Sequence, residues 1–218
     1  MAEYSRNSNL ENMVNKGTTT VAIVCQDGVV FGADTRVTAG YFVAHKFGKK
    51  IHKIDDHLAM TIAGVVADAQ QVVEILKVNA SLFRLEHKRP IAVSAAARLT
   101  ANLLFSSRGF PLLLQALIGG VDDSGTHIFA IDPLGSVIEE SCTSTGSGSP
   151  IAYGVLEDRY RQNMTIEEGT SLVVSAVTSA MKRDIASGDS FDVVIVGSDG
   201  YRELVEEEKK EIEQKIKV

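Results

Sequence analysis

The chain has 218 residues, 44% of them hydrophobic and 23% charged, which is typical of a globular protein and untypical of a disordered or fibrous one. It has 22 lysines and arginines against 28 aspartates and glutamates, so its formal net charge of −6 argues against a nucleic-acid partner. The densest apolar run, at 112–121, is shorter than the about 20 residues that span a bilayer, so we expect no membrane partner either.

The segment from Met1 to Lys16 is rich in asparagine, serine and glutamate. It has neither the basic start and apolar stretch of a secretory signal nor the periodicity of a helix or strand. We therefore expect a flexible leader, and the character of the sequence changes at Gly17-Thr18. Two cysteines, Cys25 and Cys142, are too few for a disulfide framework and indicate a reducing, cytoplasmic location.

Strand signals dominate the first part of the chain after the leader. Two β-rich runs begin at Thr18 and end at Asp34, and Asp27-Gly28 between them predicts a hairpin. Two further strand-like runs follow, at about 50–54 and 57–63.

A helical period then replaces the strand pattern. It covers residues 66–87, where Val72, Leu76 and Phe83 fall on one apolar face. Pro90 fits the first turn of a second helix. The buried face expected for this second helix consists of Ala92, Ala96, Leu99 and Leu103.

The second half of the chain repeats the order of strands followed by helices. A capping box formed by Thr165 and Glu168 predicts a long helix reaching about residue 186. Glutamate and lysine at i,i+4 spacing predict a charged helix over the last residues, 206–217. The other expected elements are strands near 112–121, 126–131, 136–143, 191–196 and 201–205, and a helix near 150–161.

This order of elements is not the strict alternation of strand and helix that builds a doubly wound parallel sheet. Strands joined by tight turns are antiparallel, and two pairs of helices can cover the outer faces of two stacked sheets. We therefore predict an α+β fold, a four-layer αββα sandwich, formed by residues 18–218 as a single domain.

Familiar catalytic and metal-binding motifs are missing from the sequence, which has no G-x-S-x-G elbow, no phosphate loop and no metal-like cluster of histidines and cysteines. What remains is Thr18 after Gly17. A threonine hydroxyl needs a base to take its proton, and a free N-terminal amine, with a pKa of about 8, can be that base. Taken alone, the three threonines at 18–20 are also simply good strand formers.

Several short motifs along the chain, taken together with Thr18, resemble those of a known family. They are, in order, Gly17-Thr18-Thr19-Thr20-Val21, Gly32-Ala33-Asp34-Thr35-Arg36, Lys50-Ile51, Ala63-Gly64, Gly146-Ser147-Gly148, Arg183-Asp184, Ser187-Gly188 and Ser198-Asp199-Gly200. With these motifs the sequence resembles a β-type, catalytic subunit of the archaeal proteasome core particle, from Thr18 to at least Gly200. The resemblance implies the N-terminal nucleophile hydrolase fold, the same sandwich that the pattern of elements predicts.

The resemblance implies a threonine endopeptidase activated by autocatalytic cleavage between Gly17 and Thr18, with residues 1–17 as a removable propeptide. Thr18 would be the nucleophile. Lys50, held by Asp34, would supply positive charge that lowers the pKa of the hydroxyl–amine pair. The N–H of Gly64 would donate to the oxyanion.

Three further residues, Ser147, Asp184 and Ser187, would orient the freed amine of Thr18 by the same resemblance. Each candidate also has a plain structural interpretation. Asp34 could simply end a strand, Lys50 could be one more exposed lysine, and the other three could be ordinary turn or helix-end residues.

The resemblance also implies a pocket for the substrate residue that precedes the scissile bond. Its lining is mostly apolar, which favours large hydrophobic side chains. The residues expected to bind substrate there are Val37, Thr38, Gly48, His52, Ile62 and Val66.

The partners implied are further copies of the chain in heptameric β-rings stacked in pairs, α-type subunits at both ends, a regulatory ATPase acting through the α-ring, and unfolded polypeptides as substrates. No metal or cofactor is expected.

The alternatives are a non-catalytic α-type ring subunit, the simpler bacterial protease that works with a hexameric unfoldase, and a metabolic amidohydrolase. An α-type subunit would carry an extra N-terminal helix and lack Thr18, the bacterial protease usually lacks a comparable leader, and the amidohydrolase usually has another nucleophile and a far larger insertion.

Overall fold

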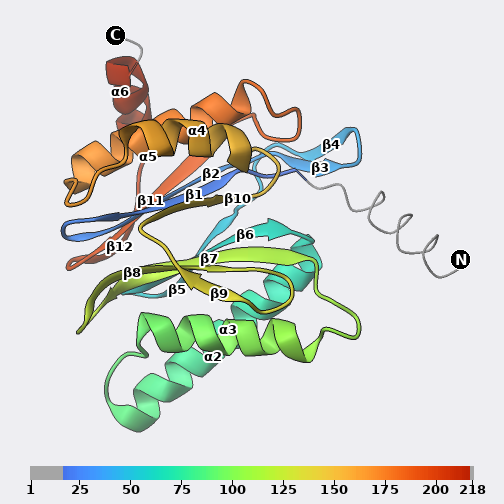
Figure 1. Cartoon of the computed structure of the whole chain (residues 1–218), viewed down its shortest axis with the longest axis vertical. Coiled ribbons are helices and arrows are strands. Elements are labelled where there is room, and N and C mark those ends of the chain that lie inside the picture. The colour runs from blue at the N-terminus through green and yellow to red at the C-terminus, as the bar shows by residue number, and fades with distance from the viewer. Residues whose placement is uncertain (1–16, 217–218) are drawn as a thin grey trace, which may run out of the picture.

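Two five-stranded antiparallel sheets lie face to face, with helices on both outer surfaces (Figure 1). The computed structural model describes residues 17–216. The flexible leader predicted for residues 1–16 lies outside this range. The four-layer αββα sandwich expected from the order of elements is confirmed, because helices contact the outer face of each sheet and strands of the two sheets contact each other.

The first sheet contains the start of the chain's first strand and therefore positions Thr18. Helices α4 (Ser149–Arg159) and α5 (Ile166–Met181) cover its outer face, and α6 (Glu206–Ile216) packs against α5. Its strands, in spatial order, are β10 (Cys142–Thr145), β1 (Thr20–Cys25), β2 (Gly28–Asp34), β11 (Phe191–Gly197) and β12 (Gly200–Glu203).

The second sheet follows the chain order without a crossover. Helices α2 (Val66–His87) and α3 (Val93–Ser106) cover its outer face. Its strands, in order, are β5 (Ile51–Asp55), β6 (Leu58–Gly64), β7 (Leu114–Asp122), β8 (Gly125–Ile131) and β9 (Val137–Glu139).

The core has three layers, one between the sheets and one under each pair of helices. Phe31, Leu117 and Ile128 are among the fully buried side chains between the sheets. All seven residues of β2 are buried, because this strand has the sheet core on one side and helix α5 on the other. Burial on both faces explains why β2 reads as an unbroken apolar run rather than an alternating one.

A small hairpin, β3 (Val37–Ala39) and β4 (Phe42–His45), stands apart from both sheets and was not predicted from the sequence. Gly40 in its turn has a φ of +59°, a conformation that glycine adopts readily. All four residues of β4 are exposed, so the segment lacks the alternation of buried and exposed side chains by which strands are recognised.

The predicted strand at 136–143 is in fact two strands in different sheets, β9 and β10. The chain crosses between the sheets at residues 140–141. There the N–H of Glu140 still donates to the carbonyl of Ile128 in the second sheet, at 3.0 Å, whereas the carbonyl of Ser141 accepts from Val24 in the first, at 2.8 Å. Because the backbone bonds continue across the switch, the sequence shows no turn signal there.

The bounds and faces of several helices differ from the predictions. Helix α5 ends at Met181 rather than near 186, and α3 begins at Val93, beyond Pro90. The first strand begins at Thr20 rather than Thr18. In α3 the predicted Leu99 and Leu103 are only half-buried. The buried face of α3 is turned toward Val93, Ala96, Ala97, Thr100, Ala101 and Leu104.

Within residues 17–216 no helix is both long enough and apolar enough to cross a membrane.

Candidate active site

Thr18 lies where the chain enters the first sheet, just before β1, and only 5% of its surface is exposed. Its N–H donates to the hydroxyl of Ser147 at 3.1 Å, and its own hydroxyl donates to the carbonyl oxygen of Gly17 at 2.7 Å. Gly17 in turn donates from its N–H to the hydroxyl of Thr38 at 3.0 Å. The candidate nucleophile and the bond before it are therefore held by two other segments of the chain, at Thr38 and at Ser147.

Gly17, the last residue of the expected propeptide, is buried and tightly packed. A Cβ at this position would lie 1.6 Å from the Cβ of Ala186. No side chain fits there unless the backbone shifts at Gly17 or at Ala186.

Lys50 and Asp34 form a buried ion pair, with 2.7 Å between the Lys50 Nζ and the Asp34 Oδ1. Their side chains are 6% and 0% exposed, whereas that of the neighbouring Lys49 is 53% exposed. Lys50 is therefore not one of a row of surface lysines. Burial lowers the pKa of the Lys50 ammonium, although the Asp34 carboxylate opposes this shift.

Asp34, the last residue of β2, accepts hydrogen bonds at both carboxylate oxygens. Oδ1, which is already paired with Lys50, also accepts from the N–H of Thr19 at 2.9 Å. Oδ2 accepts from the N–H groups of Arg36 and Gly188 at 3.1 and 3.0 Å. A buried carboxylate needs these hydrogen bonds and the opposite charge of Lys50 to compensate for its lost hydration. Asp34 thus connects the start of β1, the end of β2 and the loop before β11.

The three residues expected to orient the amine come together beside Thr18. The hydroxyls of Ser147 and Ser187 both donate to Asp184 Oδ2, each at 2.6 Å. The Ser187 hydroxyl also lies 2.7 Å from that of Thr19. A chain of hydrogen bonds therefore runs from the Thr18 nitrogen through Ser147 to Asp184.

Gly64, the last residue of β6, has a φ of +140° and adjoins the site. A Cβ at this position would lie 2.0 Å from the carbonyl oxygen of Leu113. Both the backbone conformation and this close approach require glycine.

A cavity of about 450 Å³ opens onto these groups, and Thr18, Lys50 and Gly64 all line it. Each of the six predicted pocket residues lines the same cavity: Val37, Thr38, Gly48, His52, Ile62 and Val66. Burial and the charges of Lys77 and Lys49 lower the pKa of His52 below its ordinary 6.5, so its imidazole is neutral at pH 7. The lining is thus mostly apolar near neutral pH.

Several lining residues were not predicted from the sequence, including Arg36, His45, Phe47 and Gln70. His45 ends the unpredicted hairpin, and Phe47 follows it. The one sequence signal for these residues is the aromatic Phe47, which lies close to the Lys50-Ile51 motif and is exposed in the structure.

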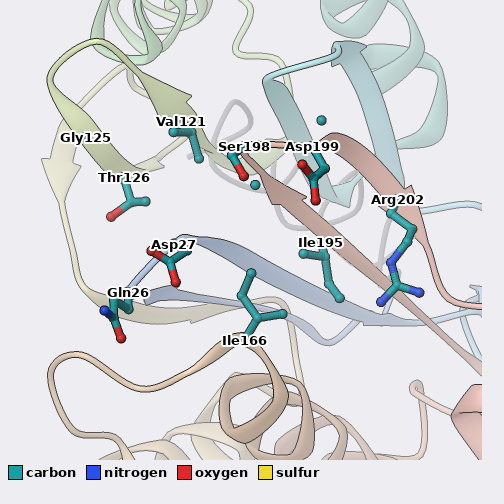
Figure 2. Close-up of a pocket in the computed structure, with 12 residues that line it drawn as sticks. Gln26, Asp27, Val121, Gly125, Thr126, Ile166, Ile195, Ser198, Asp199 and Arg202 are labelled. Carbon is teal, nitrogen blue, oxygen red and sulfur yellow. The ribbon is translucent and has the colours of Figure 1, made fainter.

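A larger cavity, of about 750 Å³, lies at the other end of β1 and holds none of the candidate residues. Figure 2 shows side chains from three strand-connecting turns and from the start of α5 around it, among them Asp27, Ile166 and Asp199. No histidine, lysine or cysteine is among the residues that line it, and it contains none of the residues predicted from the sequence to act in catalysis. Nor does the part of the chain that the structure describes bring three metal-ligating side chains together. Thr18 therefore remains the candidate nucleophile.

The stacked sheets, the helix pairs and a threonine at the head of the first strand define the N-terminal nucleophile hydrolase fold. A family model described as proteasome subunit matches residues 14–196. The chain therefore belongs to the proteasome family.

Curated relatives named proteasome subunit beta resemble the chain over most of its length. The relative from Methanococcoides burtonii is 51% identical over 190 residues, which are 87% of this chain and 90% of the relative. That from Methanothermobacter thermautotrophicus is 50% identical over 194 residues, 88% and 92% of the two chains. That from Ferroglobus placidus is 49% identical over 209 residues, 95% of this chain and all of the relative.

Proposed function

We propose that the chain is a threonine endopeptidase whose nucleophile is the hydroxyl of Thr18. Residues 1–17 are its propeptide, and residues 18–218 are its catalytic domain. The observation that carries the proposal is the surroundings of Thr18. Its nitrogen donates to Ser147, and it lines a cavity together with Lys50, whose ammonium is paired with the buried Asp34. A threonine that only began a strand would need neither group.

In the mature enzyme the freed amine of Thr18 accepts the hydroxyl proton, while the ammonium of Lys50 stabilises the negative charge that develops on the oxygen. The oxygen attacks the substrate carbonyl carbon, and the oxyanion accepts a hydrogen bond from the N–H of Gly64. The leaving nitrogen takes the proton, and water then releases the acyl group from Thr18. Ser147 and Asp184 keep the amine in place throughout.

The same hydroxyl removes the propeptide. Its oxygen attacks the carbonyl carbon of Gly17, whose carbonyl oxygen is 2.7 Å away. The bond between that carbon and the Thr18 nitrogen breaks, and the nitrogen takes the proton that the hydroxyl gives up. Water hydrolyses the resulting ester and leaves a carboxylate on Gly17 and a free amine on Thr18. While Gly17 is attached, the nitrogen is an amide and is no base, so the precursor is inactive.

The substrates are unfolded polypeptides, cut after large hydrophobic residues, because the cavity beside Thr18 is mostly apolar. The names of the relatives describe subunits of a larger particle. On this basis the chain assembles into heptameric rings stacked in pairs, with α-type subunits at the ends and a regulatory ATPase acting through them. Two free cysteines agree with a cytoplasmic location.

The test is peptide hydrolysis by the chain assembled with an α-type partner. Thr18→Ala should abolish cleavage of a fluorogenic hydrophobic peptide without preventing assembly, and Thr18→Ser should retain part of it because the hydroxyl survives. Thr126→Ala, at the other end of the molecule, is the matched control and should leave the rate unchanged. Full activity in Thr18→Ala would exclude Thr18 as the nucleophile, whereas a wild-type particle without activity would favour the non-catalytic alternative.

A further inference from the structure

The loop between α5 and β11 carries two of the residues beside Thr18, yet it is neither helix nor strand. It spans residues 182–190, which include Asp184 and Ser187. Hydrogen bonds within the loop are few and short in range, such as that from the Ser187 N–H to the carbonyl of Asp184 at 3.2 Å. A loop of this kind needs outside contacts to hold side chains in one position.

The guanidinium of Arg36 makes two such contacts from just beyond the end of β2. Its Nε donates to Asp189 Oδ2 at 2.8 Å, and its Nη1 donates to the carbonyl oxygen of Ile185 at 2.9 Å. These two acceptors lie on either side of Ser187 in the sequence. One rigid, planar group therefore ties both halves of the loop to β2.

The backbone around Arg36 adds to this attachment. Asp34 Oδ2 accepts from the N–H groups of both Arg36 and Gly188. The N–H of Thr35 donates to the carbonyl of Ser190 at 2.8 Å. The guanidinium also lies against Gly188, where a Cβ would come within 2.5 Å of its Nη2.

Asp189 is in a conformation that needs support. Its φ of +65° is in the left-handed region, which is unfavourable for residues other than glycine, although aspartate and asparagine tolerate it best. The ion pair with Arg36 is partly shielded, with side chains 24% and 17% exposed. The pair therefore stabilises the loop in the one conformation that places Ser187 on Asp184.

We propose that Arg36 is a positioning residue, whose guanidinium fixes the loop at Ile185 and Asp189 and thereby holds Asp184 and Ser187 against the amine of Thr18. The inference rests on the proposed function, since only a catalytic amine needs this orientation. Arg36 also lines the cavity, so direct contact with substrate is the competing explanation. The two differ in kinetics: a positioning residue affects kcat, whereas a substrate contact affects KM.

The experiment compares kcat and KM for hydrophobic peptide cleavage in assembled particles. We expect Arg36→Ala to lower kcat by about 10- to 100-fold, the cost of a misplaced catalytic group, with KM nearly unchanged. Millimolar guanidinium, added to this variant alone, should restore part of kcat. Arg36→Lys, which keeps the charge but not the fork, should be intermediate. Arg202→Ala, which loses an exposed pair with Glu208, is the matched control and should behave like the wild type.

Asp189→Asn tests the other side of the contact. Asparagine tolerates the left-handed conformation and keeps one acceptor for the Arg36 Nε, so this variant should assemble and lose less kcat than Arg36→Ala. Its effect should not add fully to that of Arg36→Ala in the double variant, because both changes break the same contact. If Arg36→Ala fails to assemble, Arg36→Lys and Asp189→Asn decide the question.

Hydrogen exchange gives a readout that does not depend on activity. Amides at 185–189 should exchange faster in Arg36→Ala and Asp189→Asn, while those of β11 do not change. An unchanged kcat in Arg36→Ala, or a rise in KM alone, would overturn the positioning role and leave Thr18 as nucleophile unaffected. A wild-type particle without peptidase activity would instead overturn the proposed function, whatever the loop does.

Discussion

Lys49 and Lys50 are neighbours in sequence and differ completely in environment. Lys50 is buried against Asp34, whereas Lys49 forms an exposed pair with Glu203 at 2.8 Å. We expect Lys50→Ala to lower kcat by about 10²- to 10³-fold, the usual loss when a preorganised electrostatic group is removed. Lys49→Ala should leave kcat unchanged, since exposed pairs contribute little. Steady-state kinetics on both variants checks this, and equal losses would mean that only surface charge matters.

The His52 imidazole gives the folded protein a defined response to pH. In the unfolded chain it titrates near its ordinary pKa of 6.5, and burial lowers this pKa in the folded chain. Between these two values the unfolded state binds more protons. The free energy of unfolding therefore decreases as the pH falls through 6.5, and this contribution levels off below the folded pKa.

His52→Leu removes that contribution, so the variant should lose less stability than the wild type on acidification. Thermal unfolding of both chains at about pH 7.5 and about pH 5 measures the difference. The charged groups that act on the imidazole are Lys77, Lys49 and Glu74. Equal losses in both chains would show that His52 does not titrate in this range.

Sequence motifs identified the residues around Thr18, but not the contacts that they make. Ser147 and Asp184 were expected beside the amine because their motifs occur in order, and the structure places both there. The role of Arg36 was not visible, although it stands in the same motif as Asp34. Its acceptors at Ile185 and Asp189 are about 150 residues away in sequence, and one of them is a backbone carbonyl.

At the scale of elements, the C-terminal helix depends on one buried lysine. Lys209 Nζ donates to the carbonyl of Phe191 at 2.8 Å and lies 3.7 Å from Asp192, with its side chain only 7% exposed. The i,i+4 pattern predicted that Glu206 pairs with Lys210, but the structure pairs it with Lys209. The reason is that Lys209 faces β11 and Lys210 faces outward.

Lys209→Ala should therefore destabilise the protein by about 2 kcal/mol, because it leaves a buried carbonyl and a partly buried carboxylate without their partner. Lys210→Ala should change the free energy of unfolding by less than about 0.5 kcal/mol. Urea unfolding measures both, and hydrogen exchange should show the loss first in α6. Equal stability of the two variants would mean that Lys209 does not anchor the helix.

Elements with a clear period were predicted close to their bounds, and α2 is an example, with Val72 and Leu76 buried as expected. The errors fall where tertiary contacts determine the backbone. Helix α5 ends early because residues 182–190 bond to β2 rather than continuing as helix. The strand at 136–143 divides because two sheets compete for it. Neither contact leaves a periodic pattern in the sequence.

At the scale of the whole molecule, the proposed function leads us to expect that enclosure and activation are coupled, because an active threonine protease free in solution would be hazardous. The proposed propeptide, residues 1–17, ends directly before Thr18, and its last residue, Gly17, is packed against the loop that carries Asp184. Folding of the sandwich therefore brings the nucleophile, its amide nitrogen and the bond to be cut together before the amine is free.

Leader removal should accordingly depend on the fit of Gly17. In Gly17→Ala the new Cβ would lie 1.6 Å from that of Ala186, so the backbone must shift at one of the two residues. A shift at Gly17 would disturb the position of its carbonyl relative to the Thr18 hydroxyl. We expect removal to slow by about tenfold or more. Gly109→Ala, where a Cβ meets open space, is the matched control. Intact-mass measurements on particles sampled during assembly follow the loss of residues 1–17. Thr18→Ala particles should keep the leader, and cleavage at the same bond in particles that contain only this variant would rule out self-cleavage.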